Sequence, residues 1–274
     1  MPKFEILCVT MHQSDFSKVK AMNIHSDVVF SNQCDCTDYK ELQFEGHTAK
    51  MISTATRGVG VNRNLGLLYA TGDVCLFADD DVTYFDDAEQ RVMAEFDAHP
   101  DADIIIFHLI SNDPQRTIDP YPSTKKCRRP FRMPWGGVRI AFRLRAQRCA
   151  NLWFSTLFGG GGIFPSGEDS TWLLDAKRAG LTFYVSKETI GTASFETSSW
   201  FTGYDEKLFY GKGAWIYHNH ALLFPFWKIY YVLRFRKDGN LPLKQKAQWI
   251  ENGKKGYQEM ISYQTFCEKG AGRE

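Results

Sequence analysis

Residues 57–82 read RGVGVNRNLGLLYATGDVCLFADDDV. Apolar side chains recur at helical spacing from Val61 to Leu68, and Gly72 follows them as a stop signal. Val74–Ala78 is a short apolar run that predicts a buried strand. Three aspartates, Asp79–Asp81, come directly after this strand. The stretch therefore predicts a helix, a strand and an acidic strand end in succession.

Further strands and a helix flank this stretch. The flanking strands are apolar runs at Phe4–Thr10, Asp27–Ser31 and Ile104–Leu109. A helix is expected from about Asp87 to the residue before Pro100. Strands that alternate with helices predict an α/β fold with a central, mainly parallel sheet flanked by helices. Ligands collect at the carboxyl ends of such strands, so we expect Thr10, the segment after Ser31 and Asp79–Asp81 on one rim.

The composition is that of a folded protein rather than a disordered or membrane-spanning one. The 274 residues suffice for one large α/β domain, with or without an appendage. Hydrophobic residues make up 43%, and the net charge of +1 favours no class of partner. Seven irregularly spaced cysteines argue against a disulfide framework and for a reducing compartment. No signal peptide and no apolar run of roughly 18 residues is found, so a cytoplasmic chain is expected.

The pattern loosens after residue 110. Phe158–Phe164 (FGGGGIF) predicts a glycine-rich turn, Asp169–Ala179 a helix and Phe183–Val185 a short strand. Residues after about 215 are rich in aromatic side chains, Lys and Arg, which predicts an aromatic and basic C-terminal helical extension. We therefore divide the chain into residues 1–110, residues 111–215 of the same domain, and an extension at 216–274.

The three consecutive aspartates are a candidate metal site. Adjacent carboxylates repel each other, and a cation relieves that repulsion. Oxygen ligands suit Mg²⁺ or Mn²⁺, which bind through one or two carboxylates plus substrate phosphates. In an extended segment Asp79 and Asp81 point the same way and can face one ion, with Asp80 between them. The alternative is a solvated turn that caps the next helix.

Gly167-Glu168-Asp169 opens the predicted helix of the second half. A carboxylate there can take a proton from a hydroxyl group. The alternative is a helix cap, because Ser166-x-x-Asp169 fits a capping box and acidic residues are favoured in a first turn.

A glycine-rich entry, Arg57–Gly60, leads into the helix that carries Arg63. Such an entry can bind phosphate. Arg63 occupies the third glycine position of the dinucleotide fingerprint, which argues against nicotinamide binding, and it can instead contact a diphosphate. The alternative is a surface arginine paired with an acid.

Two further segments have open interpretations. Between Lys125 and Arg148 there are nine Lys or Arg residues and no acid, with Trp135 among them. This segment is either a solvated basic face or a surface for anionic lipid, a phosphorylated acceptor or nucleic acid. His218-x-His220 either supplies a metal ligand, His218, or packs.

The segment Ala221–Arg236, ALLFPFWKIYYVLRFR, is apolar, aromatic and basic. It predicts a contact with a membrane surface or a partner chain. The alternative is ordinary packing, with Lys228 reaching out to water.

Together, these segments resemble the family 2 glycosyltransferases of the GT-A fold, from Phe4 to about residue 220. The most specific stretch is Arg57–Val82, which has the family's glycine, Arg-Asn pair, Gly-Asp and D-x-D motif. The second is Gly167–Val185, GEDSTWLLDAKRAGLTFYV, which is similar to the family's Glu-Asp helix.

The resemblance implies an inverting transfer of a sugar from a UDP- or GDP-type donor to a saccharide or lipid-linked saccharide acceptor. It implies Mn²⁺ or Mg²⁺ at Asp81 and Asp79, and Asp169 as general base. It divides the domain into a nucleotide-sugar-binding half, which includes Arg63 and Asp80, and an acceptor-binding half. Acceptor contacts are expected from Gly160, Gly161, Glu168 and Trp135. The resemblance implies a role in surface polysaccharide biosynthesis. It also suggests a peripheral protein on the inner face of a membrane.

Two segments depart from the family pattern. The second strand usually ends in acidic residues that bind the base. Here it ends in Ser31–Asp35, and we expect Asn32, Gln33 or Asp35 to make that contact. The first strand usually ends in a Pro-Thr loop, and Thr10 is its equivalent.

Three other functions fit the sequence less well. A sugar nucleotidyltransferase would need a glycine-rich loop after the first strand, and residues 10–20 contain no glycine. A non-catalytic carbohydrate-binding protein would not need both Asp81 and Asp169. A nucleic-acid-binding module would need a recognition helix or zinc motif, and neither is found, so no nucleic acid partner is expected.

Overall fold

The computed structural model describes residues 2–112, 121–127, 136–194 and 203–271. The chain forms two compact units, which are described separately. Unit 1 comprises Met1–Arg57, Val61–Phe154 and Trp172–Thr197, and unit 2 comprises Gly58–Gly60, Ser155–Thr171 and Ser198–Glu274.

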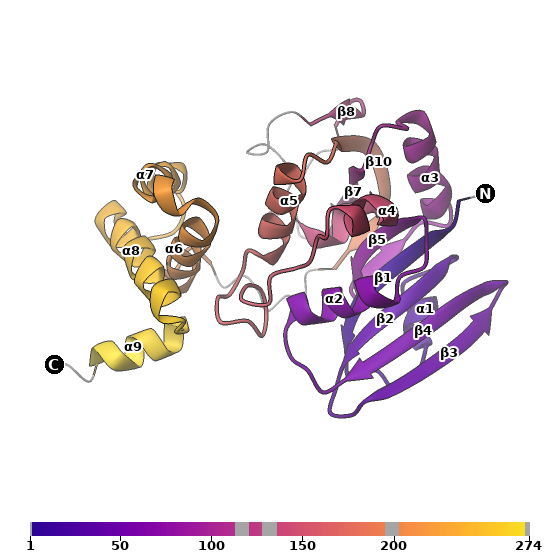
Figure 1. The fold of residues 1–274 in the computed structure, drawn as a ribbon, viewed down its shortest axis with the longest axis horizontal. Helices are drawn as coiled ribbons and strands as arrows, with labels where there is room; N and C mark the ends of the chain where they lie inside the picture. Colours follow the sequence, from indigo (N-terminus) through magenta and orange to yellow (C-terminus); the bar gives the residue numbers. More distant parts are fainter. Residues whose placement is uncertain (1, 113–120, 128–135, 195–202, 272–274) are drawn as a thin grey trace. The chain divides into compact units, whose positions relative to one another are not determined.

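Unit 1 is built on one mixed sheet (Figure 1). Its described strands are β1 Phe4–Met11, β2 Asp27–Gln33, β3 Asp38–Phe44, β4 His47–Thr54, β5 Val74–Asp79, β6 Val82–Tyr84, β7 Ile104–Ser111, β8 Lys125–Lys126, β9 Ile140–Arg143 and β10 Phe183–Ala193. They run in the order β3-β4-β2-β1-β5-β9-β7-β10-β6, with β8 paired to β10. Strands β4, β2, β1 and β5 are parallel neighbours, as are β7 and β10. The predicted α/β fold with a mainly parallel centre is confirmed.

Apolar side chains cover both faces of this sheet. Ile6 belongs to one buried cluster and Leu7 to the other, and the same division separates Val28 from Val29. Neighbours along a strand point to opposite faces, so the continuous apolar runs of β1 and β2 supply two cores. The helices before residue 180 are α1 Ser17–Ala21, α2 Val59–Tyr69, α3 Ala88–Ala98, the short 3₁₀ helix η3 Gly137–Arg139, α4 Leu144–Cys149 and α5 Glu168–Arg178.

Most of the predicted elements are confirmed. The expected strands coincide with β1, β2, β5 and β7, and the expected helices with α2, α3 and α5. Strand β10 is longer than the predicted Phe183–Val185 and runs to Ala193, because its pairing continues past irregularities after Val185 and Thr189.

The interpretation of Lys125–Arg148 as a solvated basic face holds only for part of its described residues. Strand β9 from this segment lies between β5 and β7, and its Phe142 is 1% exposed. Arg143 donates to the carbonyl oxygens of Ala102, at 2.9 Å, and Phe96, at 3.1 Å. Arg143 therefore satisfies backbone carbonyls beside a core strand, whereas Lys125, Lys126, Arg145 and Arg148 are exposed.

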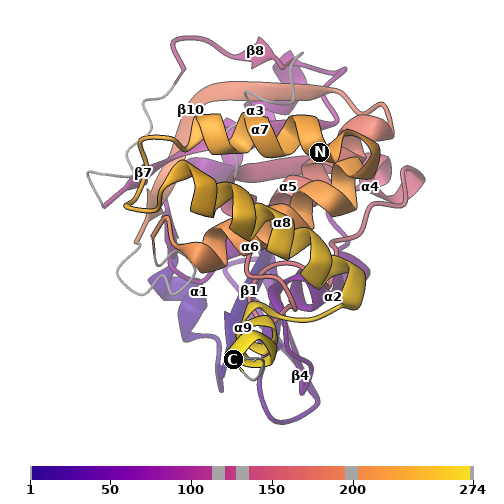
Figure 2. The same cartoon turned by 90° about the vertical axis from the view of Figure 1, so that its left-hand side faces the viewer.

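Unit 2 is helical toward its C-terminal end. Its helices are α6 Glu206–His220, the short 3₁₀ helix η4 Ala221–Leu223, α7 Phe224–Arg234, α8 Leu243–Glu259 and α9 Tyr263–Ala271. Helix α8 packs against both α6 and α7 (Figure 2). A Cβ at Gly213 of α6 would lie 1.9 Å from the Ile250 oxygen, and one at Gly253 of α8 would lie 1.9 Å from the Tyr210 oxygen. These two glycines therefore allow the backbones of α6 and α8 to touch. Among the described helices, none has both the length and the hydrophobicity that crossing a membrane requires.

Candidate active site

The carboxyl ends of β1, β2 and β5 meet at one edge of the sheet of unit 1. Thr10 on β1 stands opposite Asn32 on β2, and Val9 stands opposite Asp79 on β5. The predicted rim is therefore confirmed, because parallel strands in this register end together.

The three aspartates form a turn rather than an extended segment. Strand β5 ends at Asp79, the chain turns at Asp80 and Asp81, and β6 begins at Val82. The expectation that Asp79 and Asp81 alternate on one extended strand is therefore wrong, because the chain reverses between two strands. The turn still keeps all three carboxylates at the end of β5.

Two of these carboxylates have cationic partners in the chain. The buried guanidinium of Arg63 lies 3.2 Å from Asp79 Oδ1. Lys18 Nζ lies 3.4 Å from Asp80 Oδ2 and also donates to the Asp80 carbonyl at 3.0 Å. The Thr10 hydroxyl donates to Asp80 Oδ2 at 2.5 Å. Asp79 and Asp80 are thus held in fixed orientations by residues of three other elements.

Asp81 is in a different electrostatic position. Burial, followed by the charges of Asp79 and Asp80, raises the pKa of Asp81 to about 6. No Lys or Arg side chain within the described residues forms an ion pair with it. A carboxylate that is half-buried beside two other acids is stabilised by an added cation, so this residue fits a divalent metal ion.

The described residues contain no group of three or more His, Cys, Asp or Glu side chains placed to hold a metal ion. Mg²⁺ and Mn²⁺ sites commonly use only one or two carboxylates and complete their coordination with water and substrate phosphates. The geometry of Asp81 is compatible with a site of that open kind.

The three residues assigned to the base lie at the end of β2 in different surroundings. Asn32 is fully buried, accepts from the Gln13 amide at 3.0 Å and donates to Ser53 Oγ at 2.9 Å. Gln33 lies at the strand end and donates to Met11 Sδ at 3.4 Å. Asp35 is 82% exposed at its side chain and pairs with Arg57.

The structure adds residues that sequence patterns did not single out. Asn62 on α2 is 4% exposed and donates to the carbonyls of Thr10, at 3.3 Å, and Ser31, at 3.0 Å. It therefore ties the ends of β1 and β2 together. Lys18 on α1 is the second such residue, and it holds Asp80 through the carbonyl and carboxylate oxygens of that residue. The Arg-Asn pair of the motif pointed to the first turns of α2, but nothing in the sequence distinguished Lys18 from a surface lysine.

Unit 2 carries the glycine-rich loop and the Glu-Asp pair. The Val59 amide donates to the Gly160 carbonyl at 2.8 Å, so the loop is bound to the start of α2. Gly161 has φ +75°, a left-handed conformation that glycine adopts readily. Glu168 Oε2 accepts from the Gly167 amide at 3.1 Å. Asp169 stands next to it in the first turn of α5 and is partly exposed.

The glycine-rich loop borders a cavity of about 790 Å³ within unit 2. Its other walls come from Lys207 on α6 and from Ser262 and Tyr263 at the start of α9. The lining combines backbone, hydroxyl, amide and aromatic groups, which is the usual chemistry of a polar ligand site.

The two remaining predicted residues are His218, a predicted metal ligand, and Trp135, a predicted acceptor contact. His218 Nδ1 is 2.7 Å from the Tyr257 hydroxyl, and its ring packs against Phe158. This contact gives His218 a packing role, and its metal role stays a prediction. Trp135 lies outside the described residues.

Comparison with known proteins identifies the class of domain. The family model described as glycosyl transferase family 2 matches residues 27–154. Residues 27–154 therefore resemble a family 2 glycosyltransferase domain. The match covers β2, β5 and the aspartates, and it confirms the resemblance read from residues 57–82.

Solved structures of another protein share the fold of this chain over most of its length. The crystal structure of Staphylococcus aureus TarS 1–349 matches with a TM-score of 0.57 at 14% identity, over 95% of this chain and 93% of that one. TarS 1–349 in complex with UDP-GlcNAc matches with a TM-score of 0.58 at 13% identity, over the same shares. At these identities the likeness establishes the GT-A fold. No curated protein matches the chain.

Proposed function

We propose that the protein is a glycosyltransferase that moves a sugar from a nucleoside-diphosphate sugar to an acceptor hydroxyl. The observation that carries this proposal is the acidic end of β5 in a domain that matches the family 2 model, where Asp79 and Asp80 have cationic partners and Asp81 does not. The TarS complexes with UDP-GlcNAc and with UDP support a nucleotide-linked donor, of the UDP or GDP type.

The residues proposed for the donor ion lie in unit 1. Asp81 and Asp79 would hold Mn²⁺ or Mg²⁺, and the bound ion supplies positive charge to the departing diphosphate. Arg63 fixes the orientation of Asp79, and Thr10 and Lys18 fix that of Asp80.

The three residues assigned to the nucleotide base have different roles in this proposal. Asn32 is buried and already bonded, so it acts by positioning the backbone of Gln13. Gln33, which is partly exposed, and Asp35, which is exposed, lie at the end of the strand, and we assign them the contact with the nucleotide. Asp35 is held at this point by Arg57, which also donates to the Cys34 carbonyl at 2.7 Å.

The residues proposed for the acceptor lie in unit 2. Asp169 would take the proton from the acceptor hydroxyl as the oxygen forms its bond to the anomeric carbon. The bond from that carbon to the diphosphate oxygen breaks in the same displacement, so the configuration inverts and no covalent enzyme intermediate forms. Glu168, whose carboxylate is bonded to the Gly167 amide, would contact the acceptor rather than accept its proton.

The cavity beside the glycine-rich loop is the proposed place for the acceptor. Its volume of about 790 Å³ is in the range of sites that take small organic ligands. Gly160 and Gly161 contribute only backbone to it, which leaves room for sugar rings, and Tyr263 adds an aromatic wall. A saccharide or lipid-linked saccharide fits this lining, and a role in cytoplasmic synthesis of surface polysaccharide follows by analogy with the family.

A thermal-shift screen of UDP- and GDP-sugars with Mn²⁺ or Mg²⁺ tests the donor site. A true donor at about a hundred times its dissociation constant should raise the midpoint of unfolding by roughly 5 °C or more. The metal-dependent part of this shift should disappear in Asp81→Ala. Asp97→Asn, which changes an exposed acid on α3, is the matched control and should behave like the wild type. An unchanged shift in Asp81→Ala, or in the presence of a chelator, would remove the ion from the proposal.

A further inference from the structure

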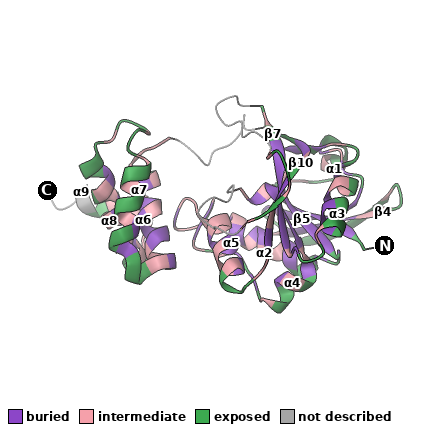
Figure 3. Cartoon of the chain, turned by 90° about the horizontal axis from the view of Figure 1, so that it is seen from above, coloured by how far each residue is buried: buried purple, intermediate pink, exposed green. Residues whose placement is uncertain are grey.

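One side of α7 and of the turn before it carries exposed apolar side chains. Figure 3 colours parts of α7 as exposed. These apolar side chains are between 36% and 98% exposed: Leu222, Leu223, Phe226, Ile229, Tyr230 and Leu233. Their spacing places them together on one side of a helix. Scattered exposed leucines are normal on protein surfaces, but a contiguous set of this size marks an interaction site. We call these six residues the α7 stripe.

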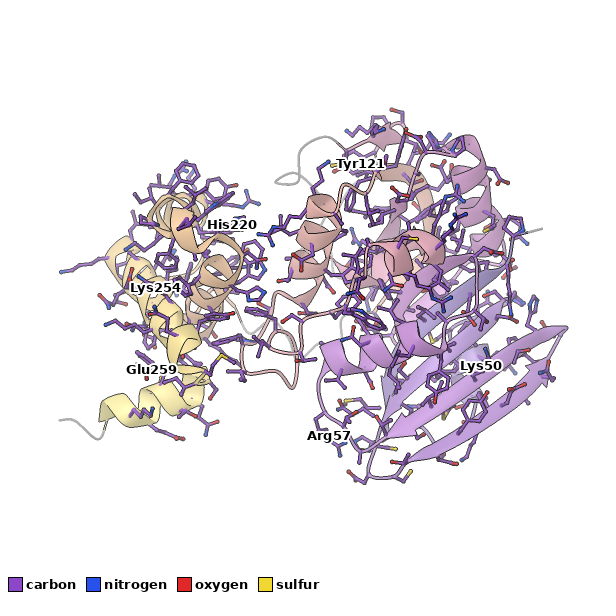
Figure 4. All side chains as sticks on the ribbon, viewed as in Figure 1. Lys50, Arg57, Tyr121, His220, Lys254 and Glu259 are labelled. Atoms are coloured by element: carbon purple, nitrogen blue, oxygen red, sulfur yellow. The ribbon has the colours of Figure 1, made fainter. Side chains whose placement is uncertain are left out.

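The opposite side of α7 already supplies the packing that the helix needs. Trp227 is 7% exposed and stacks on His220 with ring centroids 4.7 Å apart. Phe224 is 3% exposed, and Lys254 of α8 lies 5.0 Å from its ring. His220 and Lys254 are labelled in Figure 4. The α7 stripe is therefore additional to the core contacts of unit 2.

Exposed cations follow the C-terminal end of the stripe. Arg234, Arg236 and Lys237 are exposed, and within the described residues none of them pairs with an acid. Burial, followed by the charge of Arg234, lowers the pKa of Lys212 on α6, so a second cation lies nearby. Between residues 224 and 242 the sequence holds one acid, Asp238.

A buried lysine holds the turn that displays these cations. Lys246 of α8 is fully buried and donates to the carbonyls of Phe235, at 2.8 Å, and Asp238, at 2.6 Å. These bonds cover backbone oxygens at the end of α7 and fix the path of the chain from 235 to 238. The apolar stripe and the cations are thus parts of one ordered surface.

We propose that the α7 stripe lies in the interfacial layer of an anionic lipid membrane, with the axis of α7 along the membrane surface. Apolar and aromatic side chains on one face, with arginine and lysine beside them, are the chemistry that binds such a surface. The apolar side chains enter the boundary between headgroups and acyl chains, and Arg234, Arg236 and Lys237 meet the lipid phosphates.

A second copy of the chain fits this surface poorly. If two α7 helices paired in parallel, the cations of one would face those of the other. If they paired antiparallel, the cations would face the positive N-terminal end of the partner helix, where α7 has no acid in its first turn. Negatively charged lipid phosphates satisfy the cations in a way that self-association does not.

Sedimentation of the full chain with vesicles tests the proposal. The chain should sediment with vesicles that contain phosphatidylglycerol, less with pure phosphatidylcholine, and less as salt is raised. Phe226→Ser/Ile229→Ser/Leu233→Ser should weaken binding at least tenfold. Leu42→Ser/Leu68→Ser/Tyr69→Ser, which changes exposed apolar residues of unit 1, is the matched control and should bind as the wild type does.

A second variant removes the three cations and leaves the apolar side chains of the α7 stripe unchanged, so it tests the contribution of charge to vesicle binding. Arg234→Gln/Arg236→Gln/Lys237→Gln should weaken binding to the anionic vesicles with an unchanged melting temperature. Retention of the wild type in the supernatant with anionic vesicles at low salt would overturn the proposal. Equal losses in the stripe variant and its control would do the same. A third outcome would also overturn it: the wild type is a dimer that does not bind vesicles, and the stripe variant is a monomer. That result would assign the surface to self-association.

Discussion

Asp169 owes its proposed role to its place in the first turn of α5, next to Glu168, whose carboxylate is already bonded to the Gly167 amide. Asp169→Asn preserves the size and shape of the side chain but removes its capacity to take a proton. We expect turnover to fall on the order of a hundredfold or more, with donor affinity nearly unchanged. Steady-state kinetics and calorimetric titration of the donor measure the two quantities.

Glu168→Gln is the matched comparison for this variant. It changes the neighbouring acid in the same turn, so it controls for the loss of one negative charge at the helix start. A smaller fall in turnover than that of Asp169→Asn is expected. Near-normal turnover in Asp169→Asn would remove Asp169 from the role of base.

At the level of single residues, the sequence predicted the groups whose chemistry is unusual and missed those that act by position. Three adjacent aspartates attract notice because their repulsion needs an explanation. Lys18 and Asn62 do not, since a lysine on a short helix and an asparagine beside an arginine are common. Their roles depend on which strands end beside them, and this is set by the order of the strands in the sheet.

Among the elements, helix α5 depends on the glycine that precedes it. Gly167 has φ +122°, and a Cβ there would lie 2.5 Å from Trp215 Cδ1. Gly167→Ala should therefore lower the free energy of unfolding by roughly 3 kcal/mol or more, because backbone strain and a side-chain clash add. Thermal or urea unfolding measures the loss.

Gly180→Ala separates strain from clash. Gly180 follows α5 with φ +84°, and nothing lies within 4 Å of a Cβ placed there. The cost should be only the strain of a left-handed alanine, about 1 kcal/mol. Equal losses in the two variants would show that the contact with Trp215 contributes nothing.

The elements that sequence patterns missed lack an apolar signature. In β3, residues Asp38–Gln43 are exposed, so no alternation of apolar and polar residues marks the strand. The turn that joins β3 to β4 is Glu45-Gly46, with φ of +47° and +85°, and its glutamate is not one of the usual hairpin residues. Strand β9 was hidden among basic residues whose long side chains reach nearby backbone carbonyls.

For the whole molecule, the residues that the proposed function names fall in both units. Unit 1 carries Asp79–Asp81, and unit 2 carries Asp169 and the cavity beside the glycine-rich loop. The alternation of strands and helices made the fold of unit 1 predictable. The helices of unit 2 are aromatic on several faces, so their sequence predicted an extension but not which face stays exposed.

This division predicts that transfer to an acceptor and slow hydrolysis of the donor by water respond differently to substitution. Ile163→Trp fills part of the cavity in unit 2 and should lower transfer on the order of tenfold while hydrolysis stays near its wild-type rate. Asp81→Ala should lower both, because it acts on the donor. Leu42→Trp, at an exposed position on β3, controls for the added indole. Release of nucleoside diphosphate with and without acceptor measures the two rates. If Ile163→Trp lowered them equally, the cavity would belong to the donor rather than the acceptor, and the assignment of the two halves would have to be reversed.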